Sequence, residues 1–338
     1  MKLFRHIVFT LLLLIVFIGI VFNVLAAIPS IPEKVTYGVT FSKFRADELN
    51  LPWKDTYRAL LEDLGVRHFR LVAHWQMIEP EQGSFNFDEL DYQMRLAEEY
   101  GAEVVLAVGR RLPSWPECHE PSWIKDESLE EQKDDVRAYI TAVVERYKDS
   151  PALKEWQVEN EPFIIGFALG QCGALDIEFL EEEVALVRTL DPAHPVLLTA
   201  SGELGFWNNT WVRGDVFGTT LYREVWNRDL DAFVSYPTTP AFFRAKRAFT
   251  ELTTLERKPA IIAELAAEPW VEKPIVDTPL EEQLYRMNIE KLHETITFAK
   301  RTSFERQYLW GAEWWYYLKE IQNYDAVWEW ARPLFEEK

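Results

Sequence analysis

The hydrophobic pattern of the chain changes period repeatedly from Val35 onward. Short apolar runs rich in β-branched residues alternate with longer segments in which apolar residues recur every three or four positions. Runs of the first kind are typical of buried strands, and segments of the second kind are typical of amphipathic helices. The pattern predicts eight strands: Val35–Phe41, His68–Ala73, Glu103–Val108, Leu153–Glu161, Val196–Ser201, Val216–Tyr222, Pro259–Glu264 and Gln307–Trp314.

Three of the intervening segments predict helices clearly. The first has apolar residues at positions 57, 60, 61 and 64, and Gly65 supplies its end. The second begins with a Ser128–Glu131 capping box and continues in an apolar stripe over 136–147. The third begins at Thr278, with one apolar line from 285 to 299. Between the fifth and sixth strands, residues 206–214 predict at most a short helix.

The alternation predicts an α/β fold with a parallel sheet and right-handed crossovers. Eight units over about 300 residues fit a closed (β/α)8 TIM barrel better than an open doubly wound sheet. An open nucleotide-binding sheet would also carry a glycine-rich first turn, which this chain lacks. No Gly/Ser-rich linker divides the chain, so residues 33–338 are expected to form one domain with its chemistry at the carboxyl ends of the strands.

The first 28 residues differ from the rest of the chain. Lys2, Arg5 and His6 precede an apolar run from Ile7 to Phe22, and small side chains follow at positions 24 and 26. Positive charge before an apolar stretch places the N-terminus in the cytoplasm and directs the rest across a membrane. The pattern fits a cleaved signal peptide and a retained membrane anchor equally. Both predict an extracytoplasmic protein, either secreted or anchored.

Composition narrows the classes of function. The chain has 338 residues, 48% hydrophobic and 27% charged, and a net charge of −19 argues against nucleic acid as a partner. There is no HExxH, phosphate-loop, GxGxxG or GxSxG pattern, and the six histidines form no metal-spaced pair. No metal and no organic cofactor is therefore expected. The two cysteines, Cys118 and Cys172, follow the third and fourth strands. A disulfide between them in an oxidising compartment and two free thiols are both left open.

Two predicted strands end in carboxylates. The fourth closes with Asn160-Glu161-Pro162, and the seventh with Ile262-Ala263-Glu264. Strand parity places Glu161 on the side of Glu159, and Glu264 on the side of Ile262. A charged residue at the end of a buried apolar strand is costly unless it is paired or used in chemistry. Two carboxyl groups facing one cavity are the apparatus of glycoside hydrolysis, although a structural salt-bridge network with Arg70 is the simpler alternative.

These segments resemble a known superfamily. The chain from about Tyr37 to Trp314 is similar to the retaining glycoside hydrolases of the (β/α)8 clan that also contains cellulases and β-galactosidases. Those enzymes carry an acid/base on strand four and a nucleophile on strand seven. The most specific elements are Asn160-Glu161-Pro162 and the segment 79–87, Glu-Pro-Glu-Gln-Gly-Ser-Phe-Asn-Phe, which follows Arg70 and Trp75.

The resemblance implies a role for each matching residue. Glu161 would be the general acid/base and Glu264 the nucleophile, with the two carboxyl groups about 5 Å apart. Asn160 would hydrogen-bond the sugar 2-hydroxyl. Arg70 and Tyr222 would keep Glu264 ionised and aimed.

Several tryptophans are candidates for stacking on sugar rings. Trp75, Trp115 and Trp270 follow strand ends in the expected fold, and Trp314 closes the strand-eight segment that resembles the aromatic floor of the sugar site. Indole rings also fill cores, and this is the competing interpretation for each of them.

The chain departs from the family pattern in places. Arg110 and Arg111 stand where many relatives have His or Asn, and Ala263 replaces the usual Thr. Glu268 competes with Glu264 as nucleophile, but Pro269 and the preceding alanines favour a loop for Glu268. The prediction is a retaining β-glycosidase acting on an oligo- or polysaccharide. A non-catalytic glycan-binding barrel and a transglycosylase are the alternatives; the sugar, the mode of cleavage and the oligomeric state are left open.

Overall fold

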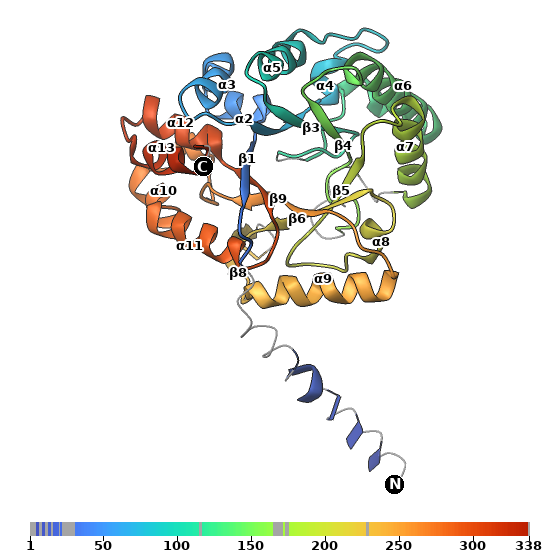
Figure 1. Ribbon diagram of the computed structural model, residues 1–338. Helices are drawn as coiled ribbons and strands as arrows, with labels where there is room; N and C mark the ends of the chain where they lie inside the picture. The colour runs from blue at the N-terminus through green and yellow to red at the C-terminus, as the bar shows by residue number, and fades with distance from the viewer. Residues whose placement is uncertain are drawn as a thin grey trace.

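The computed structural model describes residues 5–6, 9–10, 13–14, 16–19, 21, 31–114, 117–164, 172, 176–227 and 230–336. Eight parallel strands close into a barrel in the order β1-β10-β9-β6-β5-β4-β3-β2, and helices surround it (Figure 1). Because β1 pairs with both β2 and β10, no strand edge is left open. The predicted (β/α)8 barrel is therefore confirmed.

The barrel strands lie close to their predicted positions. They are β1 (Thr36–Thr40), β2 (His68–Val72), β3 (Glu103–Val108), β4 (Leu153–Val158), β5 (Val196–Ala200), β6 (Val216–Leu221), β9 (Ala260–Ala266) and β10 (Arg306–Trp310). Two predicted ends were wrong. β4 stops before Glu159, which has a φ of 56°, and β10 stops before Gly311, which has a φ of 125°. Positive φ takes the backbone out of the extended region, so neither ladder can continue.

Helices of varied length connect the strands. They are α2 (Lys43–Glu48), α3 (Trp53–Glu62), α4 (Trp75–Ile78), α5 (Asp88–Glu99), α6 (Leu129–Tyr147), α7 (Ile177–Leu190), α8 (Asn208–Trp211), α9 (Pro240–Thr254), α10 (Leu280–Arg286), α11 (Ile289–Lys300), α12 (Ala312–Glu320) and α13 (Ala326–Ala331). Short 3-10 turns lie at Ser122–Asp126, Ile275–Asp277 and Arg332–Leu334. The Ser128–Glu131 capping box and the short α8 are as predicted.

The third predicted helix is two helices. Met287 is extended, and the Asn288 side chain accepts the backbone N–H of Lys291 to cap α11. An N-cap of this kind begins a new helix because it satisfies one of the free N–H groups of the first turn. Tyr285, expected on the apolar line, is 69% exposed as a result.

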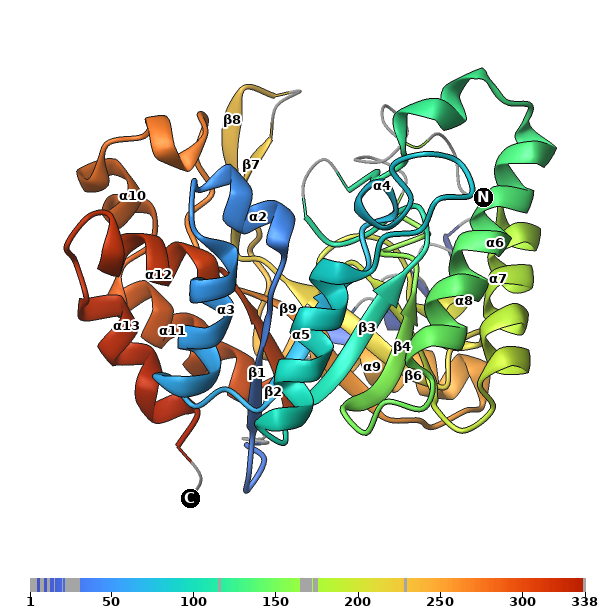
Figure 2. The same cartoon turned by 90° about the horizontal axis from the view of Figure 1, so that it is seen from above.

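The carboxyl ends of the strands carry additional structure. A hairpin of β7 (Glu224–Asn227) and β8 (Ala232–Ser235) follows β6. Figure 2 shows this hairpin together with α2 and α4 at one end of the barrel. That end is where the barrel rule places the chemistry.

The barrel interior is filled in layers. At the amino ends, Arg306 pairs with Glu155 at 2.7 Å. Above this pair lies an apolar layer of side chains from β3, β5, β6, β9 and β10: Val105, Leu197, Val216, Ile261, Ala263 and Tyr308. The next layer, at the carboxyl ends, is polar. The barrel is therefore a closed core beneath an open polar mouth.

The predicted signal or anchor lies largely outside the described residues. Side chains described there, including Phe9, Leu13 and Phe17, are more than half exposed. None of the helices in the described part of the chain has the length and hydropathy needed to cross a membrane.

Candidate active site

Glu264 lies on β9 at an irregularity of the ladder. Thr219 pairs with Ile262, but the next residue, Thr220, pairs with Glu264, so β9 carries one extra residue here; the same extra residue appears against β10. A bulge of this kind re-aims the side chains beside it. The parity expectation for Glu264 was therefore wrong: Ile262 packs in the helix-facing core, whereas Glu264 joins the polar layer inside the barrel.

Arg70 is the centre of this polar layer. It is fully buried on β2, and its guanidinium donates in three directions. Nε donates to Gln157 Oε1 at 2.7 Å, Nη1 to Glu264 Oε1 at 2.6 Å, and Nη2 to Asn160 Oδ1 at 2.8 Å. The rigid fork of an arginine suits such multiple contacts. Arg70 thus fixes the end of β4 relative to the end of β9.

Tyr222 completes the surroundings of Glu264. Its hydroxyl donates to Glu264 Oε2 at 2.9 Å, so each carboxylate oxygen has one strong donor. Burial, followed by the charge of Glu264 and the hydrogen bond to it, raises the pKa of the Tyr222 phenol well above its usual value. Tyr222 therefore remains a protonated donor. A cation and a hydroxyl donor together favour the ionised form of a carboxyl group.

Glu161 lies across Thr220 from Glu264. The Thr220 hydroxyl donates to Glu161 Oε1 at 3.1 Å, while the Thr220 backbone is the ladder partner of Glu264. Glu161 has a φ of 46°, and its N–H donates to Thr199 Oγ1 at 2.9 Å. Left-handed backbone at a glutamate is unfavourable by about 1–3 kcal/mol and persists only where the surrounding structure imposes it. Here it turns the carboxyl group toward β6.

The electrostatics of Glu161 are opposite to those of Glu264. No lysine or arginine in the described ranges forms an ion pair with it. Burial, followed by the negative charges of Glu117 and Glu264, raises the pKa of Glu161 to about 8. A carboxyl group in this setting is protonated at neutral pH and can donate a proton.

Asn160 precedes Glu161 and is oriented by three donors. Its Oδ1 accepts from Arg70, from Gln157 Nε2 at 3.3 Å and from Thr199 Oγ1 at 3.2 Å. Among the described residues, no acceptor is recorded for its Nδ2 amide. The side chain is thus held with a free donor beside Glu161.

Glu159 does not share a side with Glu161, contrary to the parity expectation. Its two oxygens accept the backbone N–H groups of Arg110 and Arg111, and its neighbour on α7 is the buried Glu183. Residues 159 and 161 both have positive φ, so the alternation of a strand no longer applies. Gly109 is required at this contact, because a Cβ there would lie 2.4 Å from Glu159 Oε1.

The candidate tryptophans divide into two groups. Trp270 is half-buried, and its ring centroid lies 5.9 Å from that of Tyr222, beside Glu264. Trp75 and Trp314 are fully buried, which corrects the expectation that they stack on sugar. The Trp75 indole donates to Glu79, and the Trp314 indole donates to Gln283. Trp115 lies outside the described residues.

Trp314 was misplaced because β10 is shorter than predicted. Gly311 ends the strand, and Trp314 lies on the inner face of α12. The residue at the strand end is Trp310, which is half-buried and donates its indole N–H to Glu268 at 2.8 Å. The Trp-Gly pair at the end of the apolar run was the sequence signal for this.

A third carboxylate, Glu117, was also missed. Its Oε2 accepts from Arg111 Nε and Nη2 at 2.9 and 2.7 Å, and its charge acts on both Glu161 and Glu264. The next residue, Cys118, forms a disulfide with Cys172, with a Cα–Cα distance of 5.4 Å, so the two cysteines are not free thiols. The disulfide joins the loops after β3 and β4. No run or motif in the sequence connects Glu117 to the two catalytic candidates.

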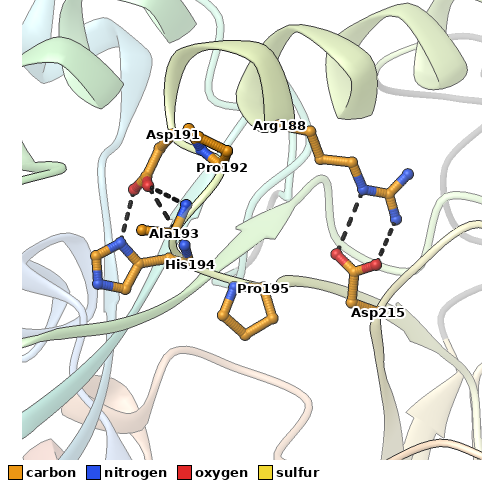
Figure 3. A pocket seen from close by; sticks show the side chains of 7 residues that line it. All are labelled: Arg188, Asp191, Pro192, Ala193, His194, Pro195 and Asp215. Atoms are coloured by element: carbon orange, nitrogen blue, oxygen red, sulfur yellow. Dashed lines mark hydrogen bonds and ion pairs between the residues drawn. The ribbon is translucent and has the colours of Figure 1, made fainter.

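A surface pocket lies at the opposite end of the barrel. Figure 3 shows it between the end of α7 and the turns before β5 and β6, lined by Arg188, Asp191, Pro192, Ala193, His194, Pro195 and Asp215. Its charged groups satisfy one another: Asp191 accepts from His194, and Asp215 accepts from Arg188. These contacts stabilise the turns, and the pocket is remote from Glu161 and Glu264. Within the described residues, no group of three His, Cys, Asp or Glu side chains is arranged to hold a metal ion.

Comparisons with known proteins agree with this fold. Residues 50–172 match the β-galactosidase family of glycoside hydrolases. The chain is 29% identical over 128 residues to a β-galactosidase of Halorubrum lacusprofundi, covering 30% of this chain and 17% of the relative. It is also 29% identical over 151 residues to a probable mannan endo-1,4-β-mannosidase of Aspergillus oryzae, covering 39% and 30%.

Solved structures share the barrel. The β-glucosidase from Thermotoga maritima superposes with a TM-score of 0.54 at 15% identity, covering 84% of this chain and 89% of that one. The GH5_18 protein from Bifidobacterium longum, in complex with Manβ1-4GlcNAc, gives a TM-score of 0.57 at 13% identity, covering 82% and 68%.

The chain is a (β/α)8-barrel relative of the glycoside hydrolases, as the resemblance in its sequence predicted. Among these families the sequence match is to the β-galactosidases, over the segment from α3 to Cys172. The chain spans less than a third of the length of these two curated relatives.

Proposed function

We propose that the protein is a retaining β-glycosidase, with Glu264 as nucleophile and Glu161 as general acid/base. The observation that carries this proposal is the opposite environment of two neighbouring carboxyl groups. Glu264 accepts hydrogen bonds from Arg70 and Tyr222, whereas Glu161 is buried, forms no ion pair with a lysine or arginine of the described residues, and has a raised pKa. Two carboxyl groups whose environments separate their protonation states are the requirement for this chemistry.

In the first step, an oxygen of Glu264 attacks the anomeric carbon. The bond from that carbon to the glycosidic oxygen breaks, and the leaving oxygen takes the proton of Glu161. The products are a covalent glycosyl–Glu264 ester, a released alcohol and an ionised Glu161. Loss of the Glu264 charge lowers the pKa of Glu161, since a nearby like charge no longer opposes its ionisation.

In the second step, Glu161 acts as a base. It takes a proton from water, the water oxygen attacks the anomeric carbon, and the bond to Glu264 breaks. Two inversions restore the original configuration. The free amide of Asn160 supports a hydrogen bond to the sugar 2-hydroxyl, and Trp270 supports an apolar contact with the ring.

The test is hydrolysis of a panel of aryl β-glycosides, with proton NMR of the first-formed product. We expect the β-anomer first, and loss of turnover in both Glu161→Gln and Glu264→Gln. Azide restores part of the turnover in Glu264→Gly, because the small anion occupies the space of the deleted carboxylate. Unchanged turnover in both glutamine variants refutes the assignment, an initial α-anomer refutes retention, and transfer to an added acceptor sugar identifies a transglycosylase.

We also propose that the folded domain works outside the cytoplasm, anchored by residues 1–28 or released by their cleavage. The basic and apolar N-terminal pattern and the Cys118–Cys172 disulfide support this location. Alkylation of the protein isolated from its host, with and without reductant, tests it by mass. Two alkylated cysteines before reduction would contradict it.

A further inference from the structure

A second glutamate, Glu268, lies four residues after the proposed nucleophile. The chain beyond β9 stays paired with β10, because the Ala267 N–H donates to the Trp310 carbonyl at 2.8 Å. Gly311 permits the close approach of Glu268: a Cβ at that glycine would lie 2.6 Å from Glu268 Cβ. Glu268 is therefore not on a free loop but is held over the end of β10.

Two donors from different elements fix the Glu268 carboxylate. Arg45 on α2 donates from Nη2 to Oε1 at 2.9 Å, and the Trp310 indole donates to the same oxygen at 2.8 Å. The arrangement follows from the barrel order, since β1, β10 and β9 are neighbours and the segments after β1 and β9 meet above β10. The side chains of Arg45 and Glu268 are only 17% and 10% exposed.

One oxygen of this fixed carboxylate keeps acceptor capacity. In the described part of the chain, Oε2 receives only a 3.4 Å contact from Arg45 Nε. A buried ion pair contributes little net stability compared with apolar side chains of similar volume. A carboxylate oxygen with acceptor capacity left can take a hydrogen bond from a donor group of a bound molecule.

The charge of Glu268 acts at the site that contains Glu264. The phenol of Tyr222, which donates to Glu264, is also affected by the charge of Glu268. Four residues of extended chain separate the two glutamates by at most about 13 Å. A hexopyranose bound with its anomeric carbon at Glu264 directs its 4-hydroxyl away from the nucleophile, since C1 and C4 are opposite corners of the ring.

We propose that Glu268, fixed by Arg45 and Trp310, accepts a hydrogen bond from the 4-hydroxyl of the sugar whose anomeric carbon reacts. This inference rests on the proposed function and names the substrate class: a neutral hexopyranoside with a free 4-hydroxyl at its non-reducing end. A uronic acid is excluded because its carboxylate, which lies next to the 4-hydroxyl on the ring, would be repelled by the negative charge of Glu268. A sugar substituted at O4 has no proton there to donate, so cleavage within a 1,4-linked chain is disfavoured.

The test compares full-length wild type, Glu268→Gln and the matched control Glu48→Gln. Glu48 also pairs with Arg45, at 3.0 Å, but on the solvent side. Each protein is assayed on the aryl β-glycoside that wild type hydrolyses fastest and on its 4-deoxy analogue. We expect Glu268→Gln to lose about 10- to 100-fold in kcat/KM on the parent sugar, the range of a hydrogen bond to a charged group. On the 4-deoxy analogue, Glu268→Gln should lose less than about twofold in kcat/KM. The analogue already lacks the hydrogen bond that the substitution removes, so the two effects are not additive.

Arg45→Lys keeps the positive charge but removes the planar guanidinium, which donates from two nitrogens to Glu268. An intermediate loss confined to the parent sugar is expected, and this variant provides the test if Glu268→Gln fails to fold. Equal losses on the parent and 4-deoxy substrates, or no loss on either, overturn the proposal while leaving the glycosidase assignment intact.

Binding of free galactose, glucose and mannose, followed by NMR titration, separates the two proposals. If wild type hydrolyses no glycoside but binds one of these sugars, and Glu268→Gln loses that binding while Glu48→Gln keeps it, the hydroxyl site stands and the hydrolase proposal fails. If wild type binds and hydrolyses none of them, both proposals fail.

Discussion

The barrel interior holds an arginine–glutamate pair at each end, and the two pairs differ in their remaining partners. At the amino ends, Arg306 Nη2 donates to both oxygens of Glu155 at 2.7 Å. At the carboxyl ends, Arg70 donates only one N–H to Glu264, and Tyr222 supplies the second donor. Both carboxylates are buried, on barrel strands and beside an arginine.

The comparison shows that a buried ion pair is not by itself a sign of catalysis. At the amino end, Arg306 satisfies both oxygens of Glu155, and the other carboxylate whose charge acts on Arg306, Glu103, has a side chain that is 45% exposed. At the carboxyl end, Glu161 lies across Thr220 from Glu264 and has no cation partner among the described residues. A protonated acid beside an ionised carboxylate distinguishes a site that can transfer protons from a pair that only stabilises the barrel.

The largest expected effect comes from removing each glutamate of the comparison in turn. Glu264→Gln should reduce kcat on an aryl β-glycoside by about 10⁴-fold or more, because the bond-forming oxygen is lost. Glu155→Gln leaves that oxygen in place, so its kcat should stay within about threefold of wild type. Steady-state kinetics on both variants measure this. Comparable losses of kcat in the two variants would mean that the Arg70–Glu264 pair, like the Arg306–Glu155 pair, is structural.

The Arg306–Glu155 pair, which should matter little for kcat, should matter for the free energy of unfolding. Arg306→Met leaves Glu155 buried without its partner, and breaking such a pair costs about 3 kcal/mol in the free energy of unfolding. The double variant Arg306→Met/Glu155→Leu should recover much of the loss, because two apolar side chains replace both charges. Denaturant unfolding of wild type, single and double variants gives the comparison. A double variant as unstable as the single one would contradict this explanation.

The strand-end rule found the two glutamates at the barrel mouth, and the family resemblance added Arg70, Asn160 and Tyr222, but neither found Glu117. Four different strands contribute these residues, each within a strand or within three residues after its end, and each strand was visible as a local apolar run: Arg70, Asn160, Glu161, Tyr222 and Glu264. Closure of the barrel then brings the carboxyl ends of these strands together, and this does not depend on the sequences of the connecting loops. This is why a local pattern predicted a non-local cluster.

The predictions that were wrong depend on irregularities of the backbone, which the pattern of side chains along one segment does not indicate. The extra residue of β9 is defined by both neighbouring strands, and the left-handed turn at Glu159 depends on Gly109 and the N–H groups after β3. The position of Trp314 depended on where β10 ends, which is set by Gly311 and its contact with Glu268. These are contacts between distant segments, so the periodicity of one segment cannot contain them.

The Arg70–Glu264 pair differs from the Arg306–Glu155 pair by the hydrogen bond that Tyr222 donates to Glu264. Tyr222→Phe removes the donor to Glu264 Oε2 and leaves Arg70 as the remaining charged donor. We expect kcat/KM to fall about 10- to 100-fold, less than for loss of the nucleophile, since one hydrogen bond to a charged group is removed. Tyr100→Phe is the control, because it also removes a tyrosine hydroxyl that donates to a glutamate, Glu62, but in an exposed hydrogen bond at the end of α5. Equal effects of the two variants would show that the Tyr222 hydroxyl has no special role.

The smallest expected effect concerns the proton of Glu161. As an acid with a pKa of about 8, Glu161 is protonated below that pH, so kcat/KM should fall as the pH rises through it. The negative charge of Glu117 raises this pKa, and Glu117→Gln should therefore lower it, the more so because Arg111 then loses its paired anion. The alkaline limb of the pH profile should move to lower pH by roughly half a unit. Glu120→Gln, which removes a carboxylate paired with Arg110 in the same loop, should leave the limb in place. A shift to higher pH in Glu117→Gln would mean that Glu117 holds Glu161 through structure and not through charge.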